Sequence, residues 1–363
     1  MVNRLVFENL KHRPVRTLLS AILIGVGVTM ILSLVGVSRG VTADMSDRSR
    51  GTGADVVVRP PGSSVFSLSG VNMLEKVVNV IRQEPHVTIA TGTLMQPVAP
   101  PFTAVAGIHP DEFNAISGGF RYLEGGPFKG PHELVVDDVE ARTDHLHVGS
   151  TVNFGNKWMV TGVVESGKLS RMFAQIEPLQ EEYSQTGKIS VVWVKVDDPA
   201  NIPAVIAALK QKLDGYPVYS MDEMTSLLTA NNLPLIENFT KVVIGIAVVV
   251  GFLVVSLSMY TAVLERTREI GILKALGGSP AYIMGILLRE TAVLAILGSI
   301  AGILMTYGAQ ALLRAFAPTF PMLIVTKWWP ITTALALAGS LIGALIPGFK
   351  AARQDAIEAL SYD

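Results

Sequence analysis

The sequence lacks cysteine entirely, and it has few charged and few aromatic residues for a chain of 363 residues. Without a thiol the chain has no disulfide, no thiolate metal site and no cysteine nucleophile. Charged residues make up 16% of the chain, whereas soluble globular domains carry about 25%. The net charge of −1 gives no sign of a nucleic-acid partner. This composition excludes an ordinary cytosolic enzyme and a disordered chain.

The scarcity of charged residues arises mainly from four apolar blocks. A helix that crosses a bilayer needs about 20 mostly apolar residues. Because no block has an ionisable residue at its centre, an ion-coupled transporter is disfavoured. The first block is longer than the apolar part of a signal peptide, so we interpret it as a retained anchor helix. The blocks span residues 17–38, 242–264, 281–313 and 328–349.

Basic residues in the short segments predict the orientation in the membrane, since cytoplasmic loops are enriched in Lys and Arg. The N-terminal segment carries four basic residues, the loop 265–280 carries three and the C-terminal tail carries two. The loop 314–327 has only Arg314 and Lys327. We therefore expect both termini and the loop 265–280 in the cytoplasm of a bacterial plasma (inner) membrane protein, with segment 39–241 outside.

The outside segment is too long for a linker, so we expect a folded domain. Two βαβ-like units flank a β-rich middle, and their alternating and helical patterns predict the strands and helices. A capping-box pattern from Ser220 to Glu223 predicts a further helix. This helix either runs into the second span as a continuous rod that would transmit motion, or it is a simple connector. The two units comprise strands at 54–59, 87–90, 189–196 and 216–219 and helices at 73–83 and 205–213.

The outside segment offers no catalytic constellation. Residues 162–169 fit G-x-x-x-x-G-K, but Leu169 stands where a hydroxyl should bind Mg²⁺, so we interpret the segment as a turn after a strand. His145 and His147 would share a face if they lay on a strand, but two histidines alone are a weak metal signal. We predict no catalytic residue, no bound cofactor, no metal and no ATPase site on this chain.

The predicted fold class is an α-helical membrane protein with four transmembrane helices. A large extracytoplasmic α+β domain is inserted between helices 1 and 2. Its α+β part comprises 41–105 and 187–240, and its β-rich part comprises 106–186. The predicted segments are a cytoplasmic amphipathic helix at 1–16, spans at 17–38, 242–264, 281–313 and 328–349, the outer domain at 39–241, a cytoplasmic loop at 265–280, a short outer loop at 314–327 and a cytoplasmic tail at 350–363.

The loop between the second and third spans mixes charged and apolar residues at helical spacing. A short amphipathic helix ending at Gly277 fits this pattern, and it is either a solvated connector or a docking element for a cytoplasmic partner. Two G-x-x-x-G patterns, Gly298–Gly302 and Gly339–Gly343, allow close helix approach within the chain or at a dimer seam.

Three stretches resemble the MacB/FtsX-type ABC transporter permeases: NLKHRPVRTLLSAILIGVGV, ERTREIGILKALGGSP and PGFKAARQDAIEAL. The resemblance implies a permease that binds two copies of a cytoplasmic ABC ATPase, which holds the ATP and Mg. It also implies a second permease copy or paralogue, with a periplasmic adaptor and an outer-membrane channel as further partners. The loop would be the helix that couples to the ATPase, through Glu265, Arg266, Arg268, Glu269, Ile270, Gly271, Ile272, Leu273, Lys274 and Leu276.

The resemblance favours an exporter of a hydrophobic or amphipathic substrate that works by mechanotransmission, in which ATPase closure moves the outer domain. The alternative is a non-transporting, FtsX-like signal transmitter that regulates a cell-wall hydrolase. A membrane-anchored enzyme is a third hypothesis, and the missing catalytic constellation disfavours it. Macrolide, peptide, glycolipid, lipoprotein and haem substrates all remain open.

Overall fold

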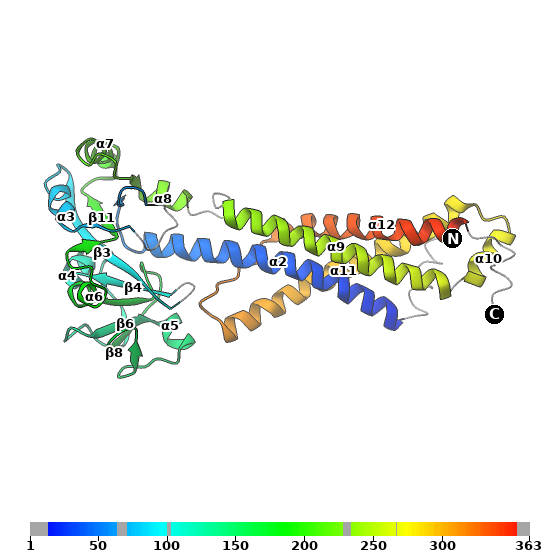
Figure 1. Ribbon diagram of the computed structural model, residues 1–363, viewed down its shortest axis with the longest axis horizontal. Helices are drawn as coiled ribbons and strands as arrows, with labels where there is room; N and C mark the ends of the chain where they lie inside the picture. The colour runs from blue at the N-terminus through cyan, green and yellow to red at the C-terminus, as the bar shows by residue number, and fades with distance from the viewer. Residues whose placement is uncertain (1–13, 64–70, 100–102, 228–233, 266, 354–363) are drawn as a thin grey trace. The chain divides into compact units, whose positions relative to one another are not determined.

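The computed structural model describes residues 14–63, 71–99, 103–227, 234–265 and 267–353. Two compact units make up the chain. The helical unit comprises 1–39, 234–314 and 322–363, and the sheet unit comprises 40–233 and 315–321. Each unit is built from segments that are distant in the sequence, as the colours of Figure 1 show.

The helical unit contains four helices that are long and apolar enough to cross a membrane. This confirms the predicted fold class of four spans with a large domain between the first and the second. Each helix is longer than its apolar block, because polar residues at the ends continue the helical hydrogen bonding. The helices are α2 (Pro14–Arg50), α9 (Pro234–Glu265), α11 (Pro280–Phe316) and α12 (Trp329–Arg353).

The four helices share one apolar core, in which buried side chains from each helix meet. Met259 is 1% exposed and Ala344 is fully buried. The hydroxyl oxygens of Ser20 on α2 and Ser258 on α9 lie 2.7 Å apart. Such pairs satisfy hydroxyl groups that lipid could not hydrogen-bond.

The sheet unit is organised around a ten-stranded sheet in its described residues. The strand order is β12-β1-β11-β3-β4-β9-β6-β8-β5, with β7 paired to β8, and a separate small sheet pairs β2 with β10. The strands are β1 (Val56–Val58), β2 (Met73–Leu74), β3 (Val87–Ala99), β4 (Thr103–Ile108), β5 (Tyr122–Gly125), β6 (Glu133–Asp137), β7 (Thr151–Asn153), β8 (Lys157–Val164), β9 (Met172–Gln175), β10 (Lys188–Ile189), β11 (Val191–Val196) and β12 (Val218–Ser220).

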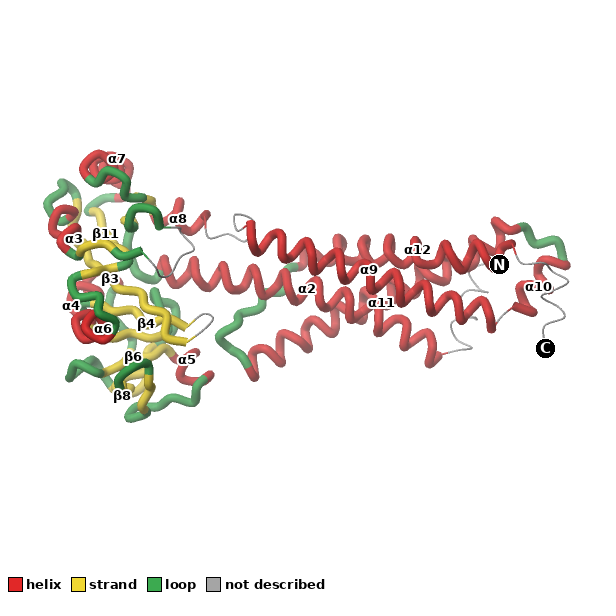
Figure 2. Tube along the Cα trace, viewed as in Figure 1, coloured by secondary structure: helices red, strands yellow, loops and turns green. Residues whose placement is uncertain are grey.

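Short helices flank the sheet. Figure 2 shows α3, α4 and α6 on the side of the strands away from α5 and α8. The Ser220 hydroxyl accepts a hydrogen bond from the backbone N–H of Glu223 at 3.1 Å, as the capping pattern predicts. The helices are α3 (Lys76–Ile81), α4 (Pro110–Ser117), α5 (Asp138–Thr143), α6 (Ile176–Glu182), α7 (Ile202–Lys212) and α8 (Met221–Leu227).

Strand β3 joins the two halves of the sheet. Its first part, from Val87, pairs with β11, and its second part, from Leu94 to Ala99, pairs with β4. The sequence predicts only four residues of this 13-residue strand, because Thr and Gly interrupt the apolar alternation. Gly92 lies close to β10, and a Cβ there would lie 2.8 Å from Ile189 Cδ1.

Several local expectations differ from the structure. The predicted helix 73–83 is a two-residue strand, β2, followed by the shorter α3, because Met73 and Leu74 pair with β10. His145 and His147 lie in a turn before β7, and His145 has a φ of 52°. A strand with both imidazoles on one face is therefore wrong. Residues 1–13 of the predicted N-terminal helix and the junction of the rod, at 228–233, lie outside the described residues, and residues 14–16 belong to α2.

Candidate functional site

A short helix, α10 (Thr267–Ala275), lies between α9 and α11, within the segment predicted to dock a partner. The hydroxyl of Thr267 donates to the carbonyl of Val263 at 3.1 Å and contacts that of Leu264 at 2.9 Å. These contacts tie the start of α10 to the end of α9. The segment is therefore helical, and its first turn is held at the end of α9.

The described side chains of α10 divide into two faces. Thr267, Ile270 and Gly271 are buried, and Ile270 belongs to the apolar core of the helical unit. Ile272 is 46% exposed and Leu276, just beyond the last residue of the helix, is 81% exposed. These two residues are four apart, so they lie on the same side. Two apolar residues are therefore exposed on the side of α10 opposite the face that packs on the core.

The C-terminal end of α10 is closed by two glycines. The N–H of Gly277 donates to the carbonyl of Lys274 at 2.9 Å, and that of Gly278 donates to Leu273 at 2.9 Å. This is a Schellman motif, which needs the left-handed φ of 88° that Gly277 adopts. A Cβ on Gly278 would lie 2.7 Å from the Leu273 carbonyl oxygen. The motif fixes where Leu276 projects.

The remaining predicted contact residues fall around this helix. Glu265 ends α9, while Leu273 and Lys274 are half-buried on α10. Arg266 lies outside the described residues, and Arg268 and Glu269 lie on α10. The structure differs from expectation at Ile270 and Gly271. Both are buried within the chain, so neither offers surface to a partner.

The first glycine pair lies where α11 meets α2. A Cβ on Gly298 would lie 2.7 Å from Ile24 Cβ, and one on Gly302 would lie 2.7 Å from the Gly25 carbonyl oxygen. The hydroxyl of Thr29 also donates to the Gly302 carbonyl at 3.0 Å. This face of α11 is therefore occupied by α2 of the same chain.

The second pair lies where α12 meets α9. A Cβ on Gly343 would lie 2.6 Å from the Phe252 carbonyl oxygen, while one on Gly339 would lie 3.5 Å from Val248. Gly343 is thus the position at which the backbones approach most closely, and Gly339 has ordinary room. Both pairs serve packing within the chain, in keeping with the small-residue rule for membrane helices.

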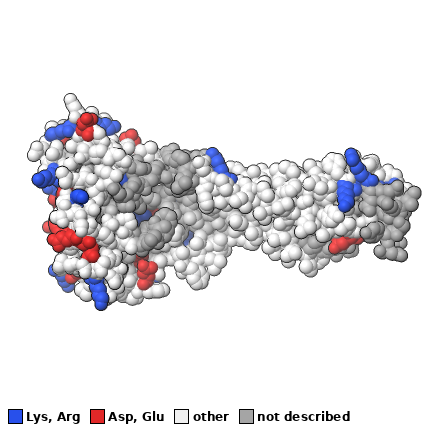
Figure 3. Space-filling model, in the orientation of Figure 1, with Lys and Arg blue, Asp and Glu red and all other residues white. Residues whose placement is uncertain are grey.

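Glu290 on α11 is buried, with 1% of its surface exposed, and no pattern in the sequence indicated this burial. At the same end of the unit, the Lys350 ammonium donates to the Tyr260 hydroxyl at 3.2 Å and lies 5.0 Å from its ring centroid. On the face in Figure 3, charged atoms are few over the long helices. They gather over the sheet and at the helix ends near α10.

The glycine-lysine segment in the sheet unit is a turn. Gly167 has a φ of 114°, the ammonium of Lys168 donates to the Ser117 carbonyl, and the N–H of Leu169 donates to the backbone carbonyl of Arg48 at 2.8 Å. A strand, β9, follows the turn where a phosphate-binding loop would be followed by a helix. In the described residues, no group of three or more acidic or histidine side chains could hold a metal.

Two buried carboxyl groups lie beside α5. Asp137 is 1% exposed, and its Oδ1 accepts from the N–H of Glu140 at 2.7 Å. Arg171 Nη1 lies 3.5 Å from Asp137 Oδ2. Glu140 is 2% exposed. Burial raises the pKa of Asp137 to about 6 and that of Glu140 to about 7, because removal from water disfavours the charged forms.

These shifts predict that stability falls as the pH rises. Between about pH 4 and about pH 7 the folded chain holds more protons than the unfolded chain, so raising the pH costs stability in that window. We expect Glu140→Gln to raise the unfolding temperature at pH 8 and to raise it much less near pH 5. Thermal unfolding of the full chain in nanodiscs checks this, with the exposed Glu181→Gln as control. If the unfolding temperature of Glu140→Gln falls with pH as steeply as that of the native chain, the prediction is wrong.

Comparison with known proteins agrees with this architecture. The model of the MacB-like periplasmic core domain matches residues 17–212. The model of the FtsX-like permease C-terminal domain matches residues 241–356. The first match alone covers more than half of the chain. The chain therefore belongs to the ABC transporter permeases of the MacB/FtsX type, as the sequence motifs indicated.

Three relatives illustrate the range of the family. The uncharacterized ABC transporter permease YknZ of Bacillus subtilis is 32% identical over 56% of this chain and 52% of its own length. YvrN of the same organism, also an uncharacterized ABC transporter permease, is 26% identical over 99% of both chains. The macrolide export ATP-binding/permease protein MacB of Burkholderia cenocepacia is 26% identical over 97% of this chain. The chain matches only about half of the lengths of YknZ and MacB, 52% and 56%.

Membership of this family makes the chain a multi-pass membrane protein. One matched model is the C-terminal domain of FtsX-like permeases and the other is a MacB-like periplasmic core domain, and the family implies a cytoplasmic ATPase as partner. The two matched regions contain the long helices and most of the inserted sheet unit.

Proposed function

We propose that the chain is the permease subunit that couples ATP hydrolysis by a separate ATPase to motion of its extracytoplasmic domain, and so exports or extracts a hydrophobic or amphipathic substrate. The single observation that carries the proposal is the exposed apolar pair on α10. Ile272 and Leu276 face outward while Ile270 anchors the helix in the core.

The anchoring of α10 supports transmission of force. A helix that packs on its own unit through one face moves with that unit when a partner pushes on the other face. The ATPase, present in two copies, would hold the ATP and Mg and receive α10 from the cytoplasm, with both chain termini on the same side. A second permease copy or paralogue would complete the complex. An adaptor and an outer-membrane channel would serve export.

Export is favoured over signalling by the likeness to a protein whose name states macrolide export, although the chain matches only 56% of its length. The FtsX-like model over 241–356 favours the alternative, a signal transmitter that regulates a cell-wall hydrolase. The partner of segment 39–241 distinguishes the two: a bound hydrolase indicates signalling, and a bound adaptor or channel indicates export.

A pull-down of the tagged full chain from native membranes tests the proposal, with ATPase activity assayed in the eluate. We expect an ABC ATPase to co-elute with the native chain. We expect Glu269→Lys and Arg268→Glu to release it, because charge reversal opposes a polar interface. If no ATPase co-elutes with the native chain, the proposal is wrong.

A further inference from the structure

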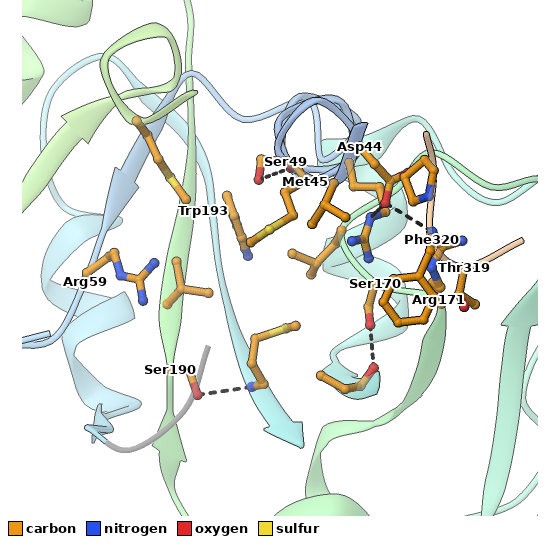
Figure 4. A pocket seen from close by; sticks show the side chains of 18 residues that line it. Asp44, Met45, Ser49, Arg59, Ser170, Arg171, Ser190, Trp193, Thr319 and Phe320 are labelled. Atoms are coloured by element: carbon orange, nitrogen blue, oxygen red, sulfur yellow. Dashed lines mark hydrogen bonds and ion pairs between the residues drawn. The ribbon is translucent and has the colours of Figure 1, made fainter. Parts of the chain in front are cut away.

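The sheet unit contains a cavity of about 120 Å³, and the residues that line it all belong to that unit. The cavity lies between the C-terminal turns of α2, strands β3, β4 and β11, and the loop at 319–321. Figure 4 shows Arg59 and Ser190 on one side of it and Asp44 and Arg171 on the other, with Met45 between them. Ten of the described residues that line it are apolar: Val41, Met45, Met95, Ala104, Leu169, Val191, Trp193, Met224, Phe320 and Pro321.

The charged groups of the wall are engaged within the chain. Arg48 Nε and Arg171 Nη2 lie 3.0 and 3.1 Å from Asp44 Oδ2. Arg171 Nη1 also lies 3.5 Å from Oδ2 of Asp137, a residue outside the lining of the cavity. Arg59 has an interaction within the chain as well. These arginines therefore do not require a charged ligand to balance them.

Hydroxyl and indole groups of the wall are hydrogen-bonded within the chain too. Ser170 Oγ donates to a backbone carbonyl at 2.7 Å, and Ser190 Oγ lies 2.9 Å from Asn72 Oδ1, to which it donates. The indole N–H of Trp193 donates to the Thr93 hydroxyl at 3.0 Å. A water molecule held inside a protein needs about two to four polar partners. Because these polar groups already bind one another, the cavity holds water poorly.

The apolar part of the wall is adaptable. Met45, Met95 and Met224 reach it from α2, β3 and α8, and methionine side chains adjust to the shape of what they contact. Val191 and Trp193 are two residues apart on β11, so they share one face of the sheet. An empty apolar cavity costs stability in proportion to its volume. A molecule that fills this one would therefore stabilise the sheet unit.

We propose that this cavity is a binding site for a small, uncharged apolar molecule about the size of one six-membered ring. An engineered apolar cavity of about 150 Å³ binds benzene, and the volume here, about 120 Å³, is similar. Drug-sized ligands need roughly 300 Å³ or more. A whole macrolide does not fit, so this site goes beyond the proposed function and is not the place of a large exported substrate.

The test uses the fact that the chain has no cysteine. In Val191→Cys the new thiol is the only one in the chain, and it stands in the wall of the cavity. Its reaction with methyl methanethiosulfonate is followed by intact-mass spectrometry, in the full chain in nanodiscs. We expect benzene at about ten times its Kd to slow this reaction about tenfold, because protection follows the fraction of occupied sites. Benzoate and benzylammonium, which add a charge to the same ring, should not slow it.

Two further variants locate the effect. Val148→Cys is the matched control, because Val148 is 40% exposed in the same unit and is not among the lining residues. Its thiol should react equally fast with and without benzene, which excludes an effect of benzene on the reagent or the bilayer. Val41→Phe, added to Val191→Cys, should fill the cavity and abolish protection by benzene.

Three results would overturn the proposal, and each needs only folded Val191→Cys and Val148→Cys chains. The first is equal labelling of Val191→Cys with and without benzene, or equal protection by benzoate. The second is a Val191→Cys thiol that does not react at all, which would show that small molecules do not reach the cavity. The third is faster labelling of Val191→Cys, but not of Val148→Cys, in lipid-free amphipol, which would assign the cavity to a lipid chain. No ATPase takes part, so the result is independent of the proposed function.

Discussion

Replacing Leu276 by aspartate is expected to remove the ATPase from the purified chain while leaving the chain folded. Leu276 is 81% exposed and follows α10 at its closed end. Exposed positions of this kind change stability by only about 0.5 kcal/mol. A central apolar contact with a partner is worth about 2 kcal/mol or more, so binding should weaken about 30-fold. Co-elution of ATPase activity with the tagged chain measures the effect.

The matched control is Leu123→Asp on β5, a leucine that is 55% exposed in the sheet unit. The control should retain the ATPase, since it makes the same chemical change away from α10. Ile272→Asp should behave like Leu276→Asp, because both residues lie on one side of the helix. Retention of the ATPase by both α10 variants would show that this surface does not bind it.

Replacing Gly302 by alanine is expected to destabilise the helical unit strongly. The added Cβ would lie 2.7 Å from both the Gly25 carbonyl oxygen and Val28 Cβ. Neither atom can move without shifting α2, so the cost should be about 1–3 kcal/mol. The measurement is the temperature at which the chain in detergent loses its monodisperse elution peak.

Gly308→Ala is the control on the same helix. No atom lies within 4 Å of a Cβ built at Gly308, and alanine favours a helix over glycine by about 0.5–1 kcal/mol. The control should therefore be neutral or stabilising. If the two variants melt at the same temperature, the close approach of α11 to α2 does not contribute to stability.

Much of the architecture could be predicted from the sequence. The four apolar blocks became four helices, because runs of about 20 apolar residues without charge have no other stable structure. The ends of the helices could not be predicted. Polar residues such as Asp44 and Arg48 continue α2 through side-chain contacts that depend on the folded sheet unit.

The sequence predicted where the candidate site lies in the chain, but it did not predict which of its side chains are exposed. The charged and apolar pattern and Gly277 located α10 correctly. Whether Ile270 or Ile272 faces a partner depends on where the core lies, because both are apolar residues on one short helix. The structure buries Ile270 and exposes Ile272.

By itself the sequence determined the class of protein, the four spans and the place of α10, since these follow from local composition, periodicity and motifs. Only the tertiary structure decided that the glycine pairs pack within the chain, that β3 joins the two halves of the sheet, and that three arginines share one cavity. Those features bring together residues far apart in the chain, such as Arg59, Arg171 and Phe320. Periodicity along the chain does not predict which distant residues meet in space, because the packing of the whole unit determines those contacts.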